Sequence, residues 1–275
     1  MKELPAELAI AVCVKFTPDP ERLRPDPATG QPDLAHAAYH TNEFDRNALE
    51  AALFLKERHG ARVVGVTLVE HEPPREVLLR AVAAGLDALY LVSHPAAGAG
   101  DGLVTATLLA AALEEIGAVY EMRRWDLVLC GDASDDGYDG QVGPRLAQAL
   151  GIVPVTYATG LELRGTTLVA RRLLEECVYV VEADLPALVT VGAETNTPRL
   201  PHLMRILEAG HKPIERLTWA DLAHAELEQA RPALQSLGAS APVSRRRRTV
   251  IQGEDPQMLA RSLVRRLLAA GEVSL

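Results

Sequence analysis

The stretch LVLCGDASDDGYDGQVGPRL, residues 127–146, decides the expected fold. It overlaps an apolar run, Trp125 to Cys130, that is typical of a buried parallel strand. A glycine-rich loop follows, and Pro144 then opens a helix that Gly151 ends. A strand, a glycine loop and a helix N-terminus together present backbone N–H groups to an anion, usually a phosphate. The stretch therefore predicts a nucleotide site, with a plain turn as the alternative because it matches neither the Walker pattern nor G-x-G-x-x-G.

Three acidic residues of this loop qualify that prediction. Asp132, Asp135 and Asp136 would repel a phosphate if their carboxylates faced it. We expect them instead to form turns, to brace the loop against a helix, or to bind a ribose.

Length and composition exclude several classes of protein. A chain of 275 residues with 48% apolar residues can bury a substantial core, in one α/β domain with an appendage or in two small domains. A net charge of −9 argues against a nucleic-acid binder and against an anionic membrane surface as partner. No uninterrupted apolar stretch reaches the roughly 18 residues that cross a bilayer, so we expect no membrane insertion.

The cysteines predict a reducing compartment. Cys13, Cys130 and Cys177 are widely spaced and lie in strand-like stretches, which indicates reduced core thiols and a cytoplasmic protein. No pair has zinc-ligand spacing, and the histidines are scattered, so no metal site is expected. Residues 1–5 lead directly into a strand, and no signal peptide is expected.

Strands and helices alternate through the first half of the chain. We expect strands over 8–14, 62–69 and 88–92, two helices that end at Gly60 and Gly85, and a third helix over 103–116. This alternation predicts a Rossmann-like α/β fold with a mostly parallel sheet and helices on both faces. The loop after Cys130 then lies at a strand's carboxyl end, where such sheets bind ligands.

The pattern changes after Gly151. Short strand candidates at 161–163, 167–173, 178–183 and 187–191 predict an added small antiparallel β region, followed by a helix at 202–209. Residues 210–248 are polar, and a last helix over 255–270 carries leucines on one face. We therefore divide the chain into a nucleotide-binding domain, 1–209, and a C-terminal arm with a helix, 210–275, which needs another subunit to pack against.

Five motifs in order make the chain resemble the β subunit of electron transfer flavoprotein, the bacterial form of which is also called the FixA type. They are Val14-Lys15 with Pro18-Asp19, Asn42 to Asp45 with Ala48 to Glu50, the loop from Gly131 to Pro144, Leu185 to Thr190, and Thr197 to Arg199. The resemblance covers nearly the whole chain and implies an adenine-nucleotide hydrolase-like version of the predicted fold. It also implies a heterodimer with an α subunit that carries most of a shared FAD site.

The family's functional residues carry over by position. The β subunit of the family holds AMP or, in electron-bifurcating members, a second FAD, and it docks acyl-CoA dehydrogenase and similar enzymes. Electrons then pass to an acceptor such as a membrane quinone oxidoreductase. The resemblance assigns nucleotide binding to Cys13, Asn42, Glu43, Phe44, Asp45, Leu68, Gly131, Asp132, Ser134, Asp136, Gly137, Gly140, Gln141, Val142 and Gly143, and partner docking to Arg199 and Leu203.

Several positions depart from the family pattern, which leaves the nucleotide and the redox partners open. They are Glu43 in place of proline, Asp132-Ala133 in place of a basic or glutamine-containing pair, Tyr138-Asp139 in place of an acidic and a small residue, Glu176-Cys177 in place of a glycine pair, and Glu208 and Gly210 in place of lysines. The run Gln141 to Pro144 resembles the FixA and bifurcating form, whereas the bulk of Tyr138 would crowd a second flavin. We favour AMP.

Other interpretations remain at this point. Asp45 has the position of a helix cap, Asn42 of a turn residue and Leu203 of a helix core residue. Residues Arg245 to Arg248 form either a solvated charge run or a contact to an acidic partner. A rival function is a stand-alone adenine-nucleotide-binding regulator similar to universal stress proteins, which would lack the segment 197–275. No nucleophile elbow or Cys/His pairing is visible, so an electron carrier subunit fits better than a stand-alone enzyme.

Overall fold

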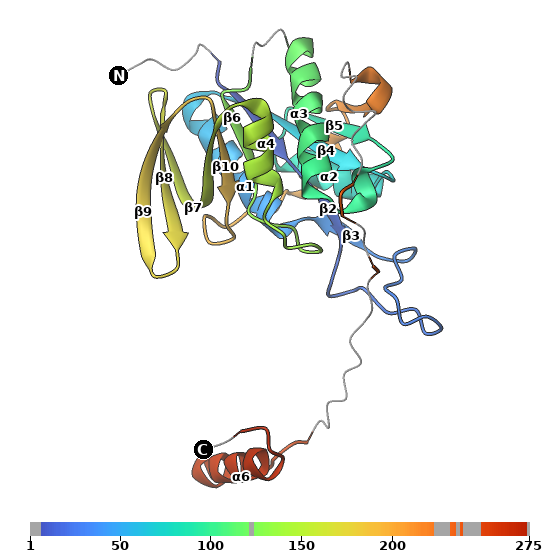
Figure 1. Ribbon diagram of the computed structural model, residues 1–275, viewed down its shortest axis with the longest axis vertical. Coiled ribbons are helices and arrows are strands. Elements are labelled where there is room, and N and C mark those ends of the chain that lie inside the picture. Colours follow the sequence, from blue (N-terminus) through green and yellow to red (C-terminus); the bar gives the residue numbers. More distant parts are fainter. Residues whose placement is uncertain (1–6, 121–123, 223–231, 235–236, 239–248, 274–275) are drawn as a thin grey trace. The chain divides into compact units, whose positions relative to one another are not determined.

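The structure, a computed structural model, describes residues 7–120, 124–222, 232–234, 237–238 and 249–273. The chain divides into two compact units, residues 1–239 and 240–275. The charge run at 245–248 lies outside the described residues. The main unit is a layered α/β structure built on one large sheet, as Figure 1 shows.

The sheet has nine strands in the order β11-β5-β4-β1-β6-β10-β7-β8-β9. Every pair from β11 to β7 is parallel, and β7, β8 and β9 continue the sheet antiparallel. The fold class expected from the alternation of strands and helices is therefore confirmed. The strand bounds are β1 Ala9–Cys13, β4 Arg62–Val69, β5 Ala88–Ser93, β6 Leu127–Gly131, β7 Val153–Arg164, β8 Thr167–Leu174, β9 Cys177–Asp184, β10 Ala187–Val191 and β11 Ile214–Thr218.

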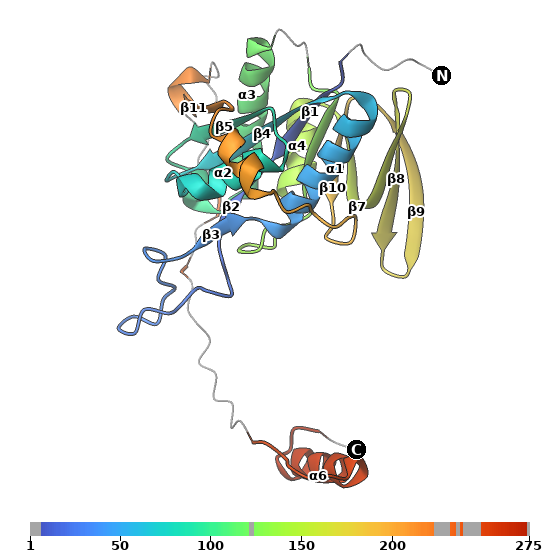
Figure 2. The ribbon, with the colours of Figure 1, turned by 180° about the vertical axis from the view of Figure 1, so that it is seen from behind.

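Strand β1 lies at the centre because both of its faces are apolar. Leu8, Ile10 and Val12 belong to the core on the side of α1 (Glu43–His59) and α2 (Arg75–Ala84). The alternate residues, Ala9, Ala11 and Cys13, belong to the core under α3 (Gly102–Val119) and α4 (Val142–Leu150). Figures 1 and 2 show these helix pairs on opposite faces of the sheet. Burial of both faces is what a parallel sheet requires.

Helix α3 is the most apolar helix of the main unit. Among the described residues it is the one helix that length and composition would allow to cross a membrane, and 61% of it is buried inside the protein. Its buried side chains pack on the sheet, as in the core helix of a globular domain.

Strand order also explains where a ligand can bind. From β1 the chain moves to β4 and β5 on one side, and later to β6 and β10 on the other side. The carboxyl ends of β1 and β6 therefore diverge into loops that leave in opposite directions, which opens a crevice in parallel sheets of this kind. The long segment after β1 leaves the sheet here, and its ends pair as β2 (Phe16–Pro18) and β3 (Tyr39–Thr41).

The second half of the chain differs from expectation in two places. Strand β7 begins at Val153, well before the expected start at 161, because its first half pairs with the parallel strand β10. Strand β11 lies within the polar stretch after residue 210 and forms the far edge of the main sheet. Edge strands tolerate polar residues because one of their sides stays open to solvent.

One cysteine assignment is wrong. Cys13 and Cys130 are buried free thiols, as expected, but Cys177 is exposed. It begins β9, the outer strand of the antiparallel extension, where the first four residues are all exposed. A strand-like sequence does not reveal whether another layer covers the strand.

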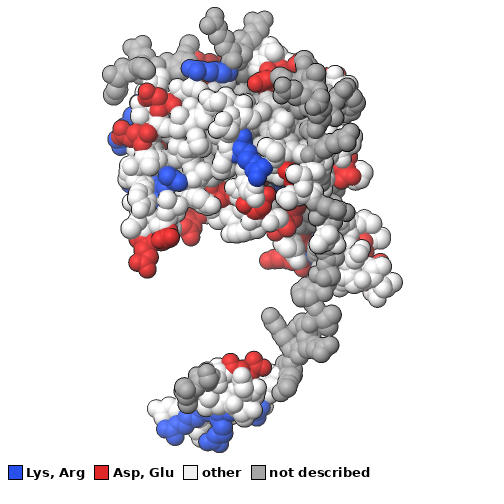
Figure 3. Space-filling view, in the orientation of Figure 1, with Lys and Arg blue, Asp and Glu red and all other residues white. Residues whose placement is uncertain are grey.

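The unit formed by residues 240–275 contains α6 (Pro256–Ala269). Asp255 caps this helix, because its side chain accepts a hydrogen bond of 2.9 Å from the Gln257 amide. No residue of α6 is buried, and Leu263 and Leu268 are exposed. Basic side chains gather on one side of this unit in Figure 3. Of the expected arm, residues 210–275, β11 belongs to the main sheet of this chain, and packing of the rest on an α subunit stays a prediction.

Candidate functional site

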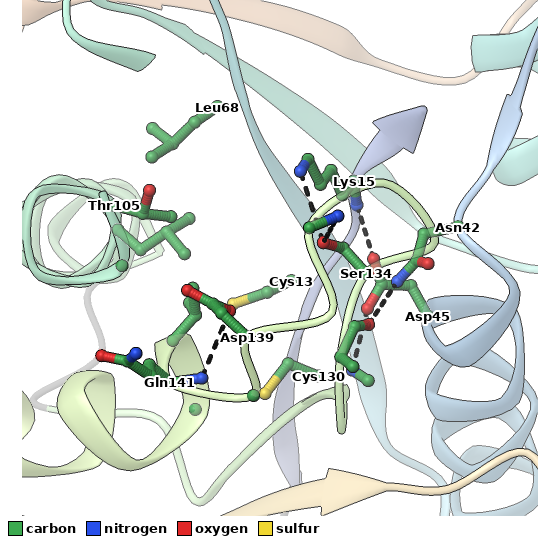
Figure 4. A pocket seen from close by; sticks show the side chains of 18 of the residues that line it. Cys13, Lys15, Asn42, Asp45, Leu68, Thr105, Cys130, Ser134, Asp139 and Gln141 are labelled. Carbon is green, nitrogen blue, oxygen red and sulfur yellow. Dashed lines mark hydrogen bonds between the residues drawn. The ribbon is translucent and has the colours of Figure 1, made fainter. Parts of the chain in front are cut away.

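A cavity of about 670 Å³ lies at the carboxyl ends of β1, β4 and β6. Most residues that the resemblance assigned to nucleotide binding line it, as Figure 4 shows in part. They are Cys13, Asn42, Asp45, Leu68, Gly131, Asp132, Ser134, Asp136, Gly137, Gly140, Gln141, Val142 and Gly143. Glu43 and Phe44 do not line it. The amide of Glu43 instead donates to Asp135, and the ring of Phe44 packs edge-on against Tyr138.

Asn42 holds the glycine loop in place. Its side-chain Nδ2 donates to the Ala133 carbonyl at 2.9 Å, and its Oδ1 accepts from the Asp135 amide at 3.0 Å. The side chain is buried, so both hydrogen bonds are shielded from water. The interpretation of Asn42 as an ordinary turn residue is wrong, because its amide clamps a loop about ninety positions away in sequence.

Asp45 ties the ends of two neighbouring strands to α1. One carboxylate oxygen accepts from the Lys15 amide at 2.7 Å, and the other accepts from the Gly131 amide at 2.8 Å. Burial raises the pKa of this carboxyl to about 6, although hydrogen bonds from Asn42, Lys15 and Gly131 oppose the shift. The helix-cap interpretation of Asp45 is wrong, because Asn42 occupies the N-cap position. Asp45 lies inside the first turn and points away from the helix end.

The loop acids act mainly as braces, one of the three expected roles. Asp132 accepts hydrogen bonds from the Thr190 hydroxyl and from the Tyr157 amide. Asp135 accepts from the Glu43 amide at 3.1 Å and so joins the loop to the start of α1. These partners turn the two carboxylates toward the protein. Burial raises the pKa of Asp132.

Lys15 and Asp136 form an ion pair at the edge of the cavity. The ammonium Nζ lies 2.6 Å from one oxygen of Asp136 and 2.8 Å from the other. Burial raises the pKa of Asp136, but the hydrogen bond and charge of Lys15 outweigh that effect and hold the pKa below its usual value. Sequence reasoning missed Lys15 as a site residue, although its place two residues after the end of β1 was the available signal.

Two loop glycines are required by close packing. A Cβ at Gly131 would lie 2.4 Å from the Cβ of Phe44, and one at Gly143 would lie 2.3 Å from the Thr190 methyl. Gly140 instead needs its backbone freedom, because its φ of +64° is rarely adopted by L side chains. The glycines therefore bring the loop close to α1 and β10 and leave its backbone open toward the cavity.

The N-terminus of α4 opens into the same cavity. Gln141 is its N-cap residue and makes no side-chain cap hydrogen bond. The first N–H groups of a helix have no partners within the helix, and the helix dipole is positive there. Gln141, Val142 and Gly143 line the cavity, so this helix start can bind one phosphate group.

The rest of the wall is largely apolar. Val66 and Leu68 come from β4, and Leu109 and Thr105 come from α3. Apolar side chains opposite an anion-binding helix start suit a nucleotide, whose base is flat and largely apolar. Cys13 and Cys130 also line the cavity, and burial raises the pKa of both thiols. The thiols therefore stay protonated and are poor nucleophiles.

The two predicted docking residues lie in different environments. Arg199 donates to both carboxylate oxygens of Glu50 at 2.8 Å and also pairs with Glu57, so its guanidinium anchors residues 197–200 to α1. Leu203 is 71% exposed at the start of α5 (Leu203–Ala209), and the interpretation of Leu203 as helix core is wrong. An exposed apolar patch surrounds it, formed by Leu200, Leu203, Met204 and Leu207. Docking of a partner by either residue stays a prediction.

Comparisons with known proteins identify relatives across most of the chain. A family model for the electron transfer flavoprotein domain matches residues 34–222. The electron transfer flavoprotein subunit beta of Megasphaera elsdenii is 35% identical over 218 residues, which covers 78% of this chain and 80% of that protein. The electron transfer flavoprotein subunit beta of Bacillus subtilis is 34% identical over 89% of this chain and 92% of that protein. The caffeyl-CoA reductase-Etf complex subunit CarD of Acetobacterium woodii is 34% identical over 75% of this chain and 77% of that protein.

Proposed function

The chain belongs to the electron transfer flavoprotein family as a relative of its β subunits, and from this premise we propose that it is the nucleotide-binding subunit of a heterodimeric electron carrier. Its partner would be an α subunit with which it shares one FAD. Dehydrogenases such as acyl-CoA dehydrogenase would supply electrons, and an acceptor such as a membrane quinone oxidoreductase would receive them. The proposed location is the cytoplasm, where free thiols such as those of Cys13 and Cys130 persist.

The observation that carries the proposal is the cavity at the point where the strand order reverses, with the open N-terminus of α4 on one side. We propose that AMP binds there. The amides of Val142 and Gly143 would hold the phosphate, and Val66, Leu68 and Leu109 would contact the base. In this role the nucleotide is structural, and its binding stabilises the loop between β6 and α4 by mass action.

The shared flavin would carry the electrons of the reaction. The contribution of this chain is to bind the nucleotide, to support the partner subunit and to present a docking surface. The two cysteine thiols of the cavity are buried and protonated, so neither is an activated nucleophile.

A second FAD in the cavity is the alternative within the family. The run Gln141 to Pro144 is complete in this chain and forms the start of α4, which favours that reading. A stand-alone regulator similar to universal stress proteins is the alternative outside the family. The match of relatives over up to 89% of the chain favours the electron carrier over that regulator.

Cofactor content tests the proposal directly. The full chain, purified together with its α subunit, is expected to give a yellow complex that releases one FAD and one AMP per heterodimer on acid treatment. Chromatography of the released nucleotides measures both. A colourless pair that no flavin reconstitutes would refute the electron-carrier function. Two FAD and no AMP would establish the bifurcating alternative, and a stable monomer that binds ATP would favour the regulator.

Replacement of Leu203 tests the docking surface. We expect Leu203→Asp to raise the KM for the reduced partner dehydrogenase about tenfold, because an exposed apolar anchor in an interface contributes roughly 1–2 kcal/mol. The unfolding midpoint should not change, since the side chain is exposed in the isolated chain. Leu34→Asp, at another exposed leucine, is the matched control and should leave KM unchanged. Equal effects of both substitutions would argue against a docking site at α5.

A further inference from the structure

Two helix N-termini flank the cavity, and they differ in how they are capped. Helix α4 makes no side-chain cap hydrogen bond. Helix α3 is capped by Asp101, whose Oδ1 accepts from the Leu103 amide at 2.8 Å and from the Val104 amide at 3.3 Å. The other oxygen of Asp101 accepts from the amides of Ala233 and Leu234. The start of α3 therefore already holds an anion, whereas the start of α4 remains available.

Asp139 lies beside both helix starts. Its Oδ1 accepts a long hydrogen bond of 3.4 Å from the Gln141 amide, next to the first turn of α4. A Cβ built on Gly102, the first residue of α3, would lie 3.2 Å from Asp139 Oδ2. Figure 4 shows the carboxylate near Gln141 and on the side of the cavity toward α3. A hydrogen bond of this length is weak, so its only described amide partner does little to neutralise the charge.

The charge balance of the cavity is unfavourable for several phosphates. Among the described residues that line it, Lys15 is the single cation. Four acidic residues line the same space, Asp45, Asp132, Asp136 and Asp139. Asp136 already neutralises Lys15 through contacts of 2.6 and 2.8 Å. One phosphate can be compensated by the start of α4, but no second compensating group is present in the described wall.

Resting on the proposed nucleotide-binding function, we propose that Asp139 is a specificity-determining residue that admits one phosphate to the cavity and rejects a second. The first phosphate binds the amides at the start of α4. A second phosphate, extending from the first toward the start of α3, meets the carboxylate of Asp139. The site therefore selects a nucleoside monophosphate over a nucleotide that carries a diphosphate.

The selectivity has a simple electrostatic origin. Two like charges a few ångströms apart in a partly exposed site repel each other enough to change an affinity by about tenfold. The repulsion is assigned to Asp139 because the other loop carboxylates already have protein partners: Asp132 is turned toward Thr190, and Asp136 is paired with Lys15. Removal of the Asp139 charge should therefore relieve the repulsion without disturbing the braces of the loop.

Binding of AMP and ADP to wild type and to Asp139→Asn tests this inference. The full chain is purified as the heterodimer with its α subunit, and any bound adenine nucleotide is removed. The heterodimer is then titrated with AMP or with ADP by calorimetry. For wild type we expect AMP to bind at least about tenfold more tightly than ADP. In Asp139→Asn the ratio of the two dissociation constants should fall about tenfold, mainly because ADP binds better. Glu176→Gln, which removes an exposed charge in the turn before β9, is the control and should leave the ratio unchanged.

The outcomes separate this inference from the proposed function. AMP binding with an unchanged ratio in Asp139→Asn would overturn the role of Asp139 and leave the nucleotide site intact. Equal binding of AMP and ADP to wild type would also overturn it. The absence of binding of either nucleotide would refute the nucleotide function and this inference with it. FAD serves as a second diphosphate probe, and it should gain affinity in Asp139→Asn as ADP does.

Discussion

Asp45→Ala is expected to lower the free energy of unfolding by about 2–6 kcal/mol near neutral pH, because it leaves two buried amides without acceptors at about 1–3 kcal/mol each. The amides are those of Lys15 and Gly131, at the carboxyl ends of β1 and β6. No water can replace the carboxylate without opening the contact between α1 and the sheet, since Asp45 is 5% exposed. Urea unfolding followed by circular dichroism measures the change.

Glu43→Ala is the matched control for this substitution. Glu43 lies two positions earlier in the first turn of α1, is largely exposed and pairs only with Arg46 among the described side chains. An exposed pair contributes about 0–1 kcal/mol, so this variant should be nearly as stable as wild type. A similar loss in both variants would mean that negative charge at the start of the helix, and not the strand contacts of Asp45, stabilises the fold.

The pH dependence of the Asp45 effect follows from its raised pKa. The pKa is about 6 in the folded protein against an ordinary value of 3.8, so the folded state binds a proton between these pH values that the unfolded state has released. The contribution of Asp45 to stability is therefore largest below about pH 4 and falls as the pH rises through about 6. The difference in stability between wild type and Asp45→Ala should be larger at about pH 4.5 than at about pH 7.5, by about 2 kcal/mol. A difference that grows with pH would contradict this sign.

Gly131→Ala should destabilise the protein by about 3 kcal/mol or more and weaken nucleotide binding at least about tenfold. The new methyl group would lie 2.4 Å from the Cβ of Phe44 and 2.8 Å from its carbonyl carbon. Backbone atoms cannot rotate away as a side chain can, so the start of α1 must move. That movement would stretch the hydrogen bonds of Asn42 and Asp45 to the loop and distort the phosphate side of the cavity.

Gly160→Ala is the control for the glycine substitution. Its Cβ would find its nearest neighbour, the Cδ of Arg171, at an ordinary 3.7 Å, and its φ is not in the left-handed region. We expect a change within about 1 kcal/mol and normal nucleotide affinity. Thermal unfolding and AMP titration of both variants provide the comparison. Normal AMP binding by Gly131→Ala would show that the loop tolerates displacement from α1.

The residue types predicted a glycine loop at the end of a strand, but they did not predict the hydrogen-bond partners of the residues around it. The spacing of apolar runs predicted a glycine loop at a strand's carboxyl end, and β6 and α4 lie on either side of that loop. The same spacing could not identify Asn42 as the clamp of this loop, because its acceptor and donor at residues 133 and 135 are distant in sequence. Local rules therefore favoured a turn for Asn42 and a cap for Asp45, and both interpretations were wrong.

Exposure was the other property that local patterns failed to supply. Leu203 and Cys177 occupy an apolar helix pattern and a strand pattern, yet both are exposed because no layer among the described residues covers them. In contrast, Ile10 and Val12 are buried as their pattern predicts, since a central strand is covered from both sides. Periodicity indicates which residues share a face, and only the neighbouring elements decide whether that face is covered.

The sequence alone determined the parallel α/β architecture, the position of the glycine loop after β6 and the family resemblance, because each of these depends on short-range order along the chain. The tertiary structure decided which side chains face the cavity, which acids act as braces, and where Asp139 lies between two helix starts. These features depend on contacts between segments that are far apart in the chain, and such contacts exist only after the sheet has brought the ends of β1, β4 and β6 together.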